Sequence, residues 1–123
     1  EISLSQILRK TIFLWTAGQP TKVEKAVAHV LRNRFRANRE EFGGRNIADV
    51  CDQFWEHEIP ENVVLPEEYE LKMNKWLPKL WNGGVHDATK GALYFRLPDE
   101  NGDDWTEGMN KTATINKIDF FKD

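Results

Sequence analysis

The stretch from residue 21 to residue 36 constrains the fold most, because its apolar repeat fits a helix. The repeat consists of Val23, Val27, Val30, Leu31 and Arg34, at intervals of three and four residues. Such intervals place side chains on one helical face. Thr21 and Glu24 have the spacing of a capping box at the helix start. Ala26 and Ala28 keep the helix slim, so we expect a central, largely buried helix here.

Helical patterns also occur on both sides of this segment. A helix over residues 4 to 16 is predicted by a capping box at Ser3 and by a face made of Leu4, Leu8, Ile12 and Trp15. A short apolar segment at 47 to 54 follows the loop at Gly43. Pro66 suits the first position of a further helix over residues 66 to 82. Pro78 should bend or divide that helix, because proline lacks an N–H donor.

Beyond residue 90 the composition favours strands. Residues 92 to 95 form a compact apolar run, and residues 112 to 121 are rich in β-branched and aromatic side chains. A turn at Asn116 and Lys117 would pair 112–115 with 118–121 in a hairpin. A chain of 123 residues has an ordinary length for one domain. We therefore predict a single α+β domain, residues 1–123, with a mainly helical lobe and a small antiparallel β lobe.

Charge and composition exclude several classes of function. Hydrophobic residues make up 40% of the chain and charged residues 30%, which suits a folded core. The net charge of −3 argues against a nucleic-acid-binding protein, whose surface is normally basic. No run of about 18 apolar residues is present, as a membrane span would require. We expect four arginines to be solvated rather than to form an anion site: Arg32, Arg34, Arg36 and Arg39.

The sequence lacks the common motifs of catalysis and metal binding. It contains no Gly-x-Ser-x-Gly, phosphate-loop or dinucleotide-binding motif. The histidines and the single Cys51 lack the paired spacing of zinc ligands. Residues 99 to 104 begin like a calcium-binding EF-hand loop, but Asp104 stands where that loop requires glycine. We therefore predict neither a metal nor a cofactor.

A series of short motifs occurs in a distinctive order. The turn at residues 17 to 20 reads Ala-Gly-Gln-Pro, and the central helix contains Ala26-Val27-Ala28 and Asn33-Arg34. Gln53-Phe54 follows, and residues 87 to 95 read Asp-Ala-Thr-Lys-Gly-Ala-Leu-Tyr-Phe, before Trp105 and the strand at 118 to 121. In this order the motifs resemble the cell wall hydrolase family typified by bacterial spore-cortex-lytic enzymes. That family also occurs in phage and prophage lysis proteins.

The resemblance implies a fold, a ligand and a location. It implies a lysozyme-like helical lobe, a small β lobe and, between them, a groove for the glycan strands of peptidoglycan. It implies that the glycan is contacted by Trp15, Gln19, Gln53, Phe54 and Tyr94. It also implies an extracytoplasmic or phage-associated location.

The sequence departs from this family where the catalytic glutamate is expected. The family places that carboxylate just before its Ala-Arg-Gly-Glu-Pro turn, and Trp15 occupies the position here. Leu14, Ala17 and Gln19 replace the neighbouring glycine, arginine and second glutamate. Glycosidases use a carboxylic acid to protonate the leaving oxygen, and an indole cannot do so.

Three functions are compatible with this departure. The domain has lost its acid and now binds glycan strands or serves as a structural module. Alternatively, it is an active, divergent muramidase or lytic transglycosylase that uses Glu24, or else Glu56 or Glu58. The plainer role of Glu24 is helix capping, and that of the other two is solvated surface. The third function is a protein-interaction module of a phage particle or secretion apparatus, with Trp55 or Trp105 as anchors unless they pack in the core.

Overall fold

The computed structural model describes residues 4–16, 19–54, 64–97 and 106–123. Within them, the helices are α1 (Leu4–Thr16), α2 (Thr21–Ala37), α3 (Ile47–Phe54) and α4 (Glu67–Trp81). A single 3₁₀ turn, η1 (Glu40–Phe42), lies between α2 and α3. The strands are β1 (Tyr94–Arg96), β2 (Asn110–Ile115) and β3 (Ile118–Lys122). The predicted α+β class is confirmed, with helices followed by a small antiparallel sheet.

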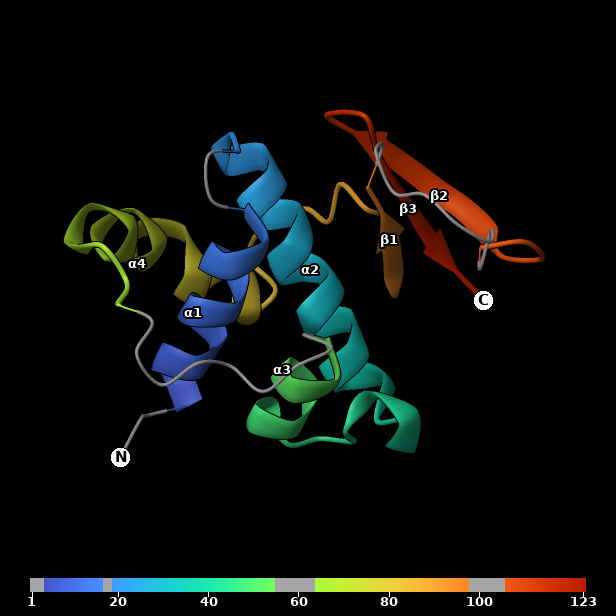
Figure 1. Cartoon of the computed structure of the whole chain (residues 1–123), viewed down its shortest axis with the longest axis horizontal. Coiled ribbons are helices and arrows are strands. Elements are labelled where there is room, and N and C mark those ends of the chain that lie inside the picture. The colour runs from blue at the N-terminus through green and yellow to red at the C-terminus, as the bar shows by residue number, and fades with distance from the viewer. Residues whose placement is uncertain (1–3, 17–18, 55–63, 98–105) are drawn as a thin grey trace.

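Helix α2 runs through the middle of the molecule, with the other helices on one side and the sheet on the other (Figure 1). It contacts α1, α3 and α4, and it also contacts β2. Every residue from Ala26 to Leu31 is buried, so all faces of this part of the helix are covered. A helix that is covered all round belongs to the core. The prediction of a central, buried helix is confirmed.

The start of α2 differs from the predicted capping box. Thr21 is already the first helical residue, and Pro20 is the N-cap, with no side-chain capping bond. Pro20 has an extended backbone, and its carbonyl oxygen accepts the N–H of Val23 at 2.9 Å. Glu24 therefore lies one position too late to bond back to the cap residue. The predicted box is wrong because the proline, one residue earlier, already starts the helix.

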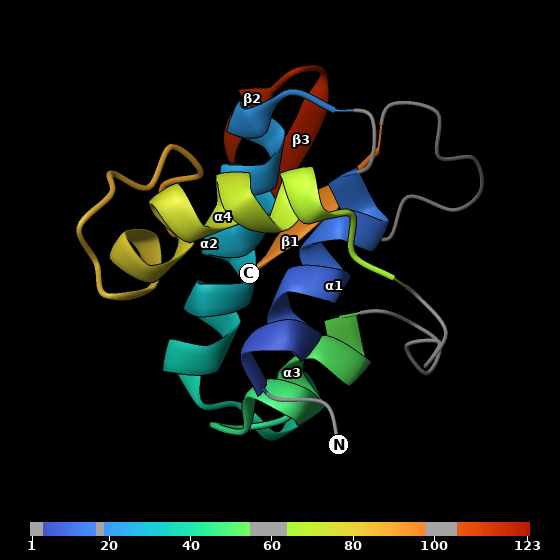
Figure 2. The same ribbon diagram turned by 90° about the vertical axis from the view of Figure 1, so that its left-hand side faces the viewer.

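The remaining helices follow the sequence patterns closely. Helix α1 has the predicted bounds, although Ser3 and its capping box lie outside the described residues, and the short apolar segment at 47 to 54 forms α3. Pro66 is the N-cap of α4 rather than its first residue, and Pro78 lies inside the helix without dividing it. Figure 2 shows α4 lying across α1 and α2, which it contacts. This packing surrounds the turns on both sides of Pro78 with buried contacts from Trp76, Leu77 and Leu80.

The sheet has the order β1-β3-β2, with both pairs antiparallel. The hairpin register places Ile115 opposite Ile118, as predicted. Asn116 and Lys117 both have positive φ, of 51° and 68°, as two-residue hairpin turns require. The register shifts between Lys111 and Ala113, which marks a bulge. The prediction of an antiparallel sheet within residues 91 to 121 is confirmed.

The loop before β1 is fastened to α2 by Asp87. Its Oδ2 accepts the Asn33 side-chain N–H at 3.0 Å and the Gly91 backbone N–H at 2.9 Å. Its Oδ1 accepts the backbone N–H of Thr89 at 2.9 Å and the hydroxyl at 2.6 Å. Asn33 also donates to the carbonyl of Ala92 at 3.0 Å. The paired motifs Asn33-Arg34 and 87–95 therefore act together, as a clamp between the central helix and the β lobe.

The four arginines do not form the solvated group that we expected. Arg34 donates from Nε to the carbonyl of Leu93 at 2.6 Å, and its guanidinium lies 4.6 Å from the centroid of the Phe42 ring. Burial lowers the pKa of Arg34 to about 10. Arg32 donates to the carbonyl of Trp81, while Arg39 pairs with Asp123. The expectation is wrong for Arg32 and Arg34, whose side chains bond the carbonyl groups of Trp81 and Leu93, whereas the ion pair of Arg39 lies at the surface.

Candidate functional site

Trp15 lies in the last turn of α1 and faces the sheet. Its ring meets the ring of Phe95 in β1 edge to face, with centroids 5.0 Å apart. Phe95 in turn lies 5.9 Å from the ring of Phe120, which is fully buried. Trp15 itself is half-buried and packs against the hydrophobic core. The helix end and the β lobe are thus joined by a row of aromatic rings.

Gln19 connects the turn after α1 to the tip of the hairpin. Its Oε1 accepts the side-chain N–H of Asn116 at 2.9 Å, across 97 residues of sequence. Both residues are exposed. The amide oxygen of Gln19 therefore bonds the hairpin tip. Gln19 and Trp15 therefore both contact the β lobe, at the turn and at β1.

Tyr94 precedes Phe95 in β1, so its side chain points to the opposite face of the strand. Its ring meets that of Phe42 at 5.6 Å, in a T-shaped contact. The guanidinium of Arg34 lies 5.2 Å from the Tyr94 ring centroid. Burial raises the pKa of Tyr94, and Asp123 adds to this effect, while Arg34 and Arg39 oppose it. Tyr94 is thus packed between η1 and α2.

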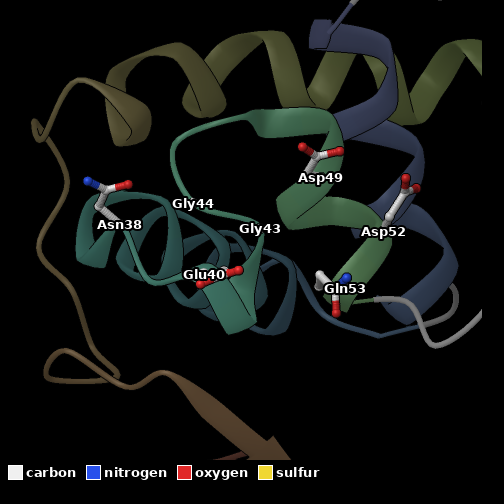
Figure 3. A pocket seen from close by; sticks show the side chains of 7 residues that line it. All are labelled: Asn38, Glu40, Gly43, Gly44, Asp49, Asp52 and Gln53. Atoms are coloured by element: carbon white, nitrogen blue, oxygen red, sulfur yellow. The ribbon is translucent and has the colours of Figure 1, made fainter.

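Gln53 lies at a polar pocket of about 500 Å³, which we call the Gln53 pocket. Figure 3 shows Asp49, Asp52 and Gln53 on α3, with Glu40 on the neighbouring η1. The remaining lining residues are Asn38, Gly43 and Gly44. Carboxylates and amide oxygens accept hydrogen bonds from hydroxyl and N–H groups. The pocket can therefore bind a ligand rich in such donors.

Gly43 shapes this pocket by letting two chain segments approach closely. A Cβ added at Gly43 would lie 2.6 Å from the backbone carbon of Asp49, and the residue has a φ of +93°. Either feature alone disfavours a side chain. The Gly43-Gly44 sequence was predicted only as a loop, and the structure gives it the further role of bringing η1 against α3.

Glu24 is buried on α2, with a relative exposure of 3%. Burial raises the pKa of its carboxyl group, and the charge of Lys72 and a hydrogen bond from Thr21 offset part of this rise. Lys72 lies on α4 and Thr21 lies one turn earlier on α2. The pKa of Glu24 is therefore shifted in the direction found for general acids, but its side chain is covered by protein.

The predicted site residues fall in separate parts of the described structure. Trp15 and Gln19 contact the β lobe, Tyr94 packs toward η1, and Gln53 lines its own pocket. The side chain of Phe54 lies outside the described residues, as do Trp55, Glu56, Glu58 and Trp105. The sequence analysis missed Asp49 and Asp52, although Asp49 lies three residues before Asp52 and four before Gln53 along α3, which makes it a helical neighbour of both.

Comparison with known proteins identifies the class of protein. The chain matches the family model described as Cell Wall Hydrolase over residues 18–121. This match covers most of the chain, which therefore belongs to the cell wall hydrolase family and has a peptidoglycan-related function. Trp15 precedes the matched stretch. No curated protein and no solved structure matches the chain significantly.

The described residues contain neither a membrane-spanning helix nor a metal-binding cluster. None of their helices has the length and hydropathy needed to cross a membrane. In the same part of the chain, no group of three or more histidine, cysteine, aspartate or glutamate side chains is arranged to hold a metal ion. The three acidic residues of the Gln53 pocket are thus not arranged as a metal centre.

Proposed function

We propose that this domain binds the glycan strands of peptidoglycan without cleaving them. Within its family it resembles the spore-cortex-lytic type, and Trp15 occupies the position of the catalytic glutamate. The observation that carries the proposal is the contact of Trp15 with Phe95, at a centroid distance of 5.0 Å. At this position the domain has an aromatic packing contact where the enzymes have a proton donor.

The surroundings of Trp15 also support the loss of catalysis. Leu14 and Gln19 stand where the family has glycine and a second glutamate, and Gln19 bonds Asn116 of the hairpin. A catalytic acid needs neighbours that tune its pKa and fix its geometry. Restoring one carboxylate at Trp15 would leave it against the Phe95 ring, without those neighbours.

The Gln53 pocket supports the retention of glycan binding. Sugar hydroxyl and acetamido N–H groups are hydrogen-bond donors, and the pocket presents acceptors from Asp49, Asp52, Gln53 and Glu40. Its volume of about 500 Å³ lies within the usual range for ligand pockets, about 300 to 1,000 Å³. We propose that glycan strands contact this pocket.

A digestion and binding experiment tests the proposal. The purified domain should sediment with peptidoglycan but release no muropeptides from it. Trp15→Glu should remain inactive. A double variant, Asp52→Asn with Gln53→Ala, should bind less peptidoglycan than the wild type, while Glu68→Gln, on the exposed face of α4, should bind equally. Robust digestion by the wild type would refute the loss of catalysis, and absence of sedimentation would refute glycan binding.

A second candidate function keeps the chain an enzyme through Glu24. It is favoured by one observation, the raised pKa of this buried carboxyl group, since general acids are tuned in this direction. Digestion that is abolished by Glu24→Gln in a folded protein would establish this candidate. A Glu24→Gln variant that loses only thermal stability would instead assign Glu24 a structural role, as the partner of Thr21 and Lys72.

A further inference from the structure

A second pocket lies between α1, α4 and the start of α3, and shares no lining residue with the Gln53 pocket. Its volume is about 250 Å³. The walls are apolar and consist of Leu8, Ile47, Leu77, Pro78 and Trp81. We call it the Trp81 pocket. Ligand pockets usually measure about 300 to 1,000 Å³, so this one suits a small group of one or two residues.

The polar lining of the Trp81 pocket includes a positive charge. Among the described residues, Arg9 and Asn82 complete the lining, and none of the lining residues is acidic. The pocket is therefore positive in a chain whose net charge is −3. The guanidinium of Arg9 is positioned by α4, since its Nη2 donates to Oδ1 of Asn74 at 2.6 Å. A planar guanidinium beside an apolar surface is well suited to a carboxylate that carries an apolar group.

The aromatic wall of the pocket, Trp81, is held in place by residues of α2. The Trp81 ring packs against that of Phe35 on α2, with centroids 5.7 Å apart. The backbone carbonyl of Trp81 accepts the Nε–H of Arg32 at 2.9 Å. A wall that is already ordered loses little conformational freedom when a ligand binds.

We propose that the Trp81 pocket binds the free C-terminal end of a short peptide with small apolar side chains. The carboxylate pairs with Arg9, the terminal side chain packs on Trp81 and Leu77, and Asn82 bonds a peptide group. The choice of a peptide rests on the proposed glycan-binding function. The peptides attached to these strands end in a carboxylate next to an alanine methyl group, which is the chemistry that the pocket matches.

A matched pair of ligands tests this inference. Acetyl-D-alanyl-D-alanine and its C-terminal amide differ only in the charge that Arg9 is expected to recognise. Titration of the whole chain, followed by the NMR signal of the Trp81 indole N–H, should show binding of the acid at least tenfold tighter than that of the amide. Arg9→Gln should weaken binding of the acid about tenfold, to the level of the amide. Lys10→Gln, which removes the neighbouring charge on α1, should leave it unchanged.

Other variants and ligands keep the test decisive if Arg9→Gln does not fold. Ile47→Trp fills the pocket from α3 and should abolish binding of the acid. Equal affinities for acid and amide, or binding that Ile47→Trp does not disturb, would overturn the inference. Hexanoate has the charge without the peptide groups, and equally tight binding of hexanoate would overturn the assignment to a peptide. Peptide-free glycan strands are titrated alongside, so that failure of the dipeptide alone refutes this site, and failure of the glycan alone refutes the proposed function.

Discussion

Asp87→Asn should destabilise the domain strongly, although it changes only one atom of the side chain. The Oδ2 atom of Asp87 accepts two N–H groups, from Asn33 and Gly91, and Oδ1 accepts the N–H and hydroxyl of Thr89. An asparagine must direct its NH₂ group at one of these pairs. Each pair includes a backbone N–H, from Thr89 or Gly91, which cannot turn away. In either orientation the asparagine NH₂ group therefore faces a backbone N–H, and that hydrogen bond is lost.

The expected loss follows from the number and kind of these bonds. A hydrogen bond to a charged group contributes about 1.5 to 3 kcal/mol, and an unsatisfied partner costs about 1 to 3 kcal/mol. The Asp87 side chain is 25% exposed, so that water can replace part of what is lost. We therefore expect the free energy of unfolding to fall by about 2 to 3 kcal/mol. For a chain of this size, that corresponds to a decrease of about 10 °C in the melting temperature.

Urea unfolding followed by circular dichroism measures this loss, with Asp52→Asn as the matched control. Asp52 is exposed on α3, and its substitution should change stability by less than about 0.5 kcal/mol. If Asp87→Asn were no more destabilising than the control, the clamp between α2 and the β lobe would not hold the loop as the geometry indicates.

The pH dependence provides a second measurement. Burial alone would raise the pKa of Asp87, but the hydrogen bonds from Thr89, Asn33 and Gly91 outweigh it and hold the pKa below 3.8. The stabilisation is fully present above the unfolded value near 3.8, and it is lost as the pH falls through the lower folded value. The difference between wild type and variant should therefore narrow below pH 3.8. A difference that stays constant in acid would contradict an ionised Asp87.

Three further predictions concern other contacts. Burial lowers the pKa of His29 below 6.5, so the unfolded chain binds a proton more readily than the folded chain, and the free energy of unfolding should decrease as the pH falls below that value. His29→Gln should reduce this pH dependence of the free energy of unfolding, measured with urea between pH 7.5 and 5.5. A double-mutant cycle of Gln19→Ala and Asn116→Ala should give a coupling of about 0.5 kcal/mol, and additive effects would show that their bond contributes nothing. Lys117→Gly should raise the free energy of unfolding by about 0.5 kcal/mol, because Lys117 has a φ of +68°, whereas Lys111→Gly, within β2, should lower it.

Much of the fold could be predicted because its signals are local. The repeat at 21 to 36, the apolar face at 4 to 16 and the turn at Asn116 each depend on residues a few positions apart. Such spacings determine which side chains share a face, whatever surrounds them. The departures were local as well, since Pro20 rather than Thr21 caps α2, and Pro78 is accommodated within α4.

The candidate site was less predictable, because its chemistry depends on residues far apart in the chain. Gln53 was identified through a motif, but the pocket around it also needs Glu40 from η1 and the close approach at Gly43. Glu24 looked like a helix cap, and only the packing of α4 shows that its carboxyl group is buried. The sequence contains no signal for such burial, since a glutamate at this position of a helix has the same sequence pattern whether it is exposed or buried.

The sequence by itself therefore determined the helices, the hairpin, the family and the absence of a glutamate at position 15. Tertiary structure decided that Trp15 meets Phe95, that Asn33 and Asp87 form a clamp, and that Arg34 is enclosed between α2 and the sheet. The physical reason is the separation along the chain of the residues that interact. A helix or a turn is fixed by neighbours within about one turn of chain, whereas these contacts join residues more than 50 positions apart, and each exists only once α2 lies between the other helices and the strands.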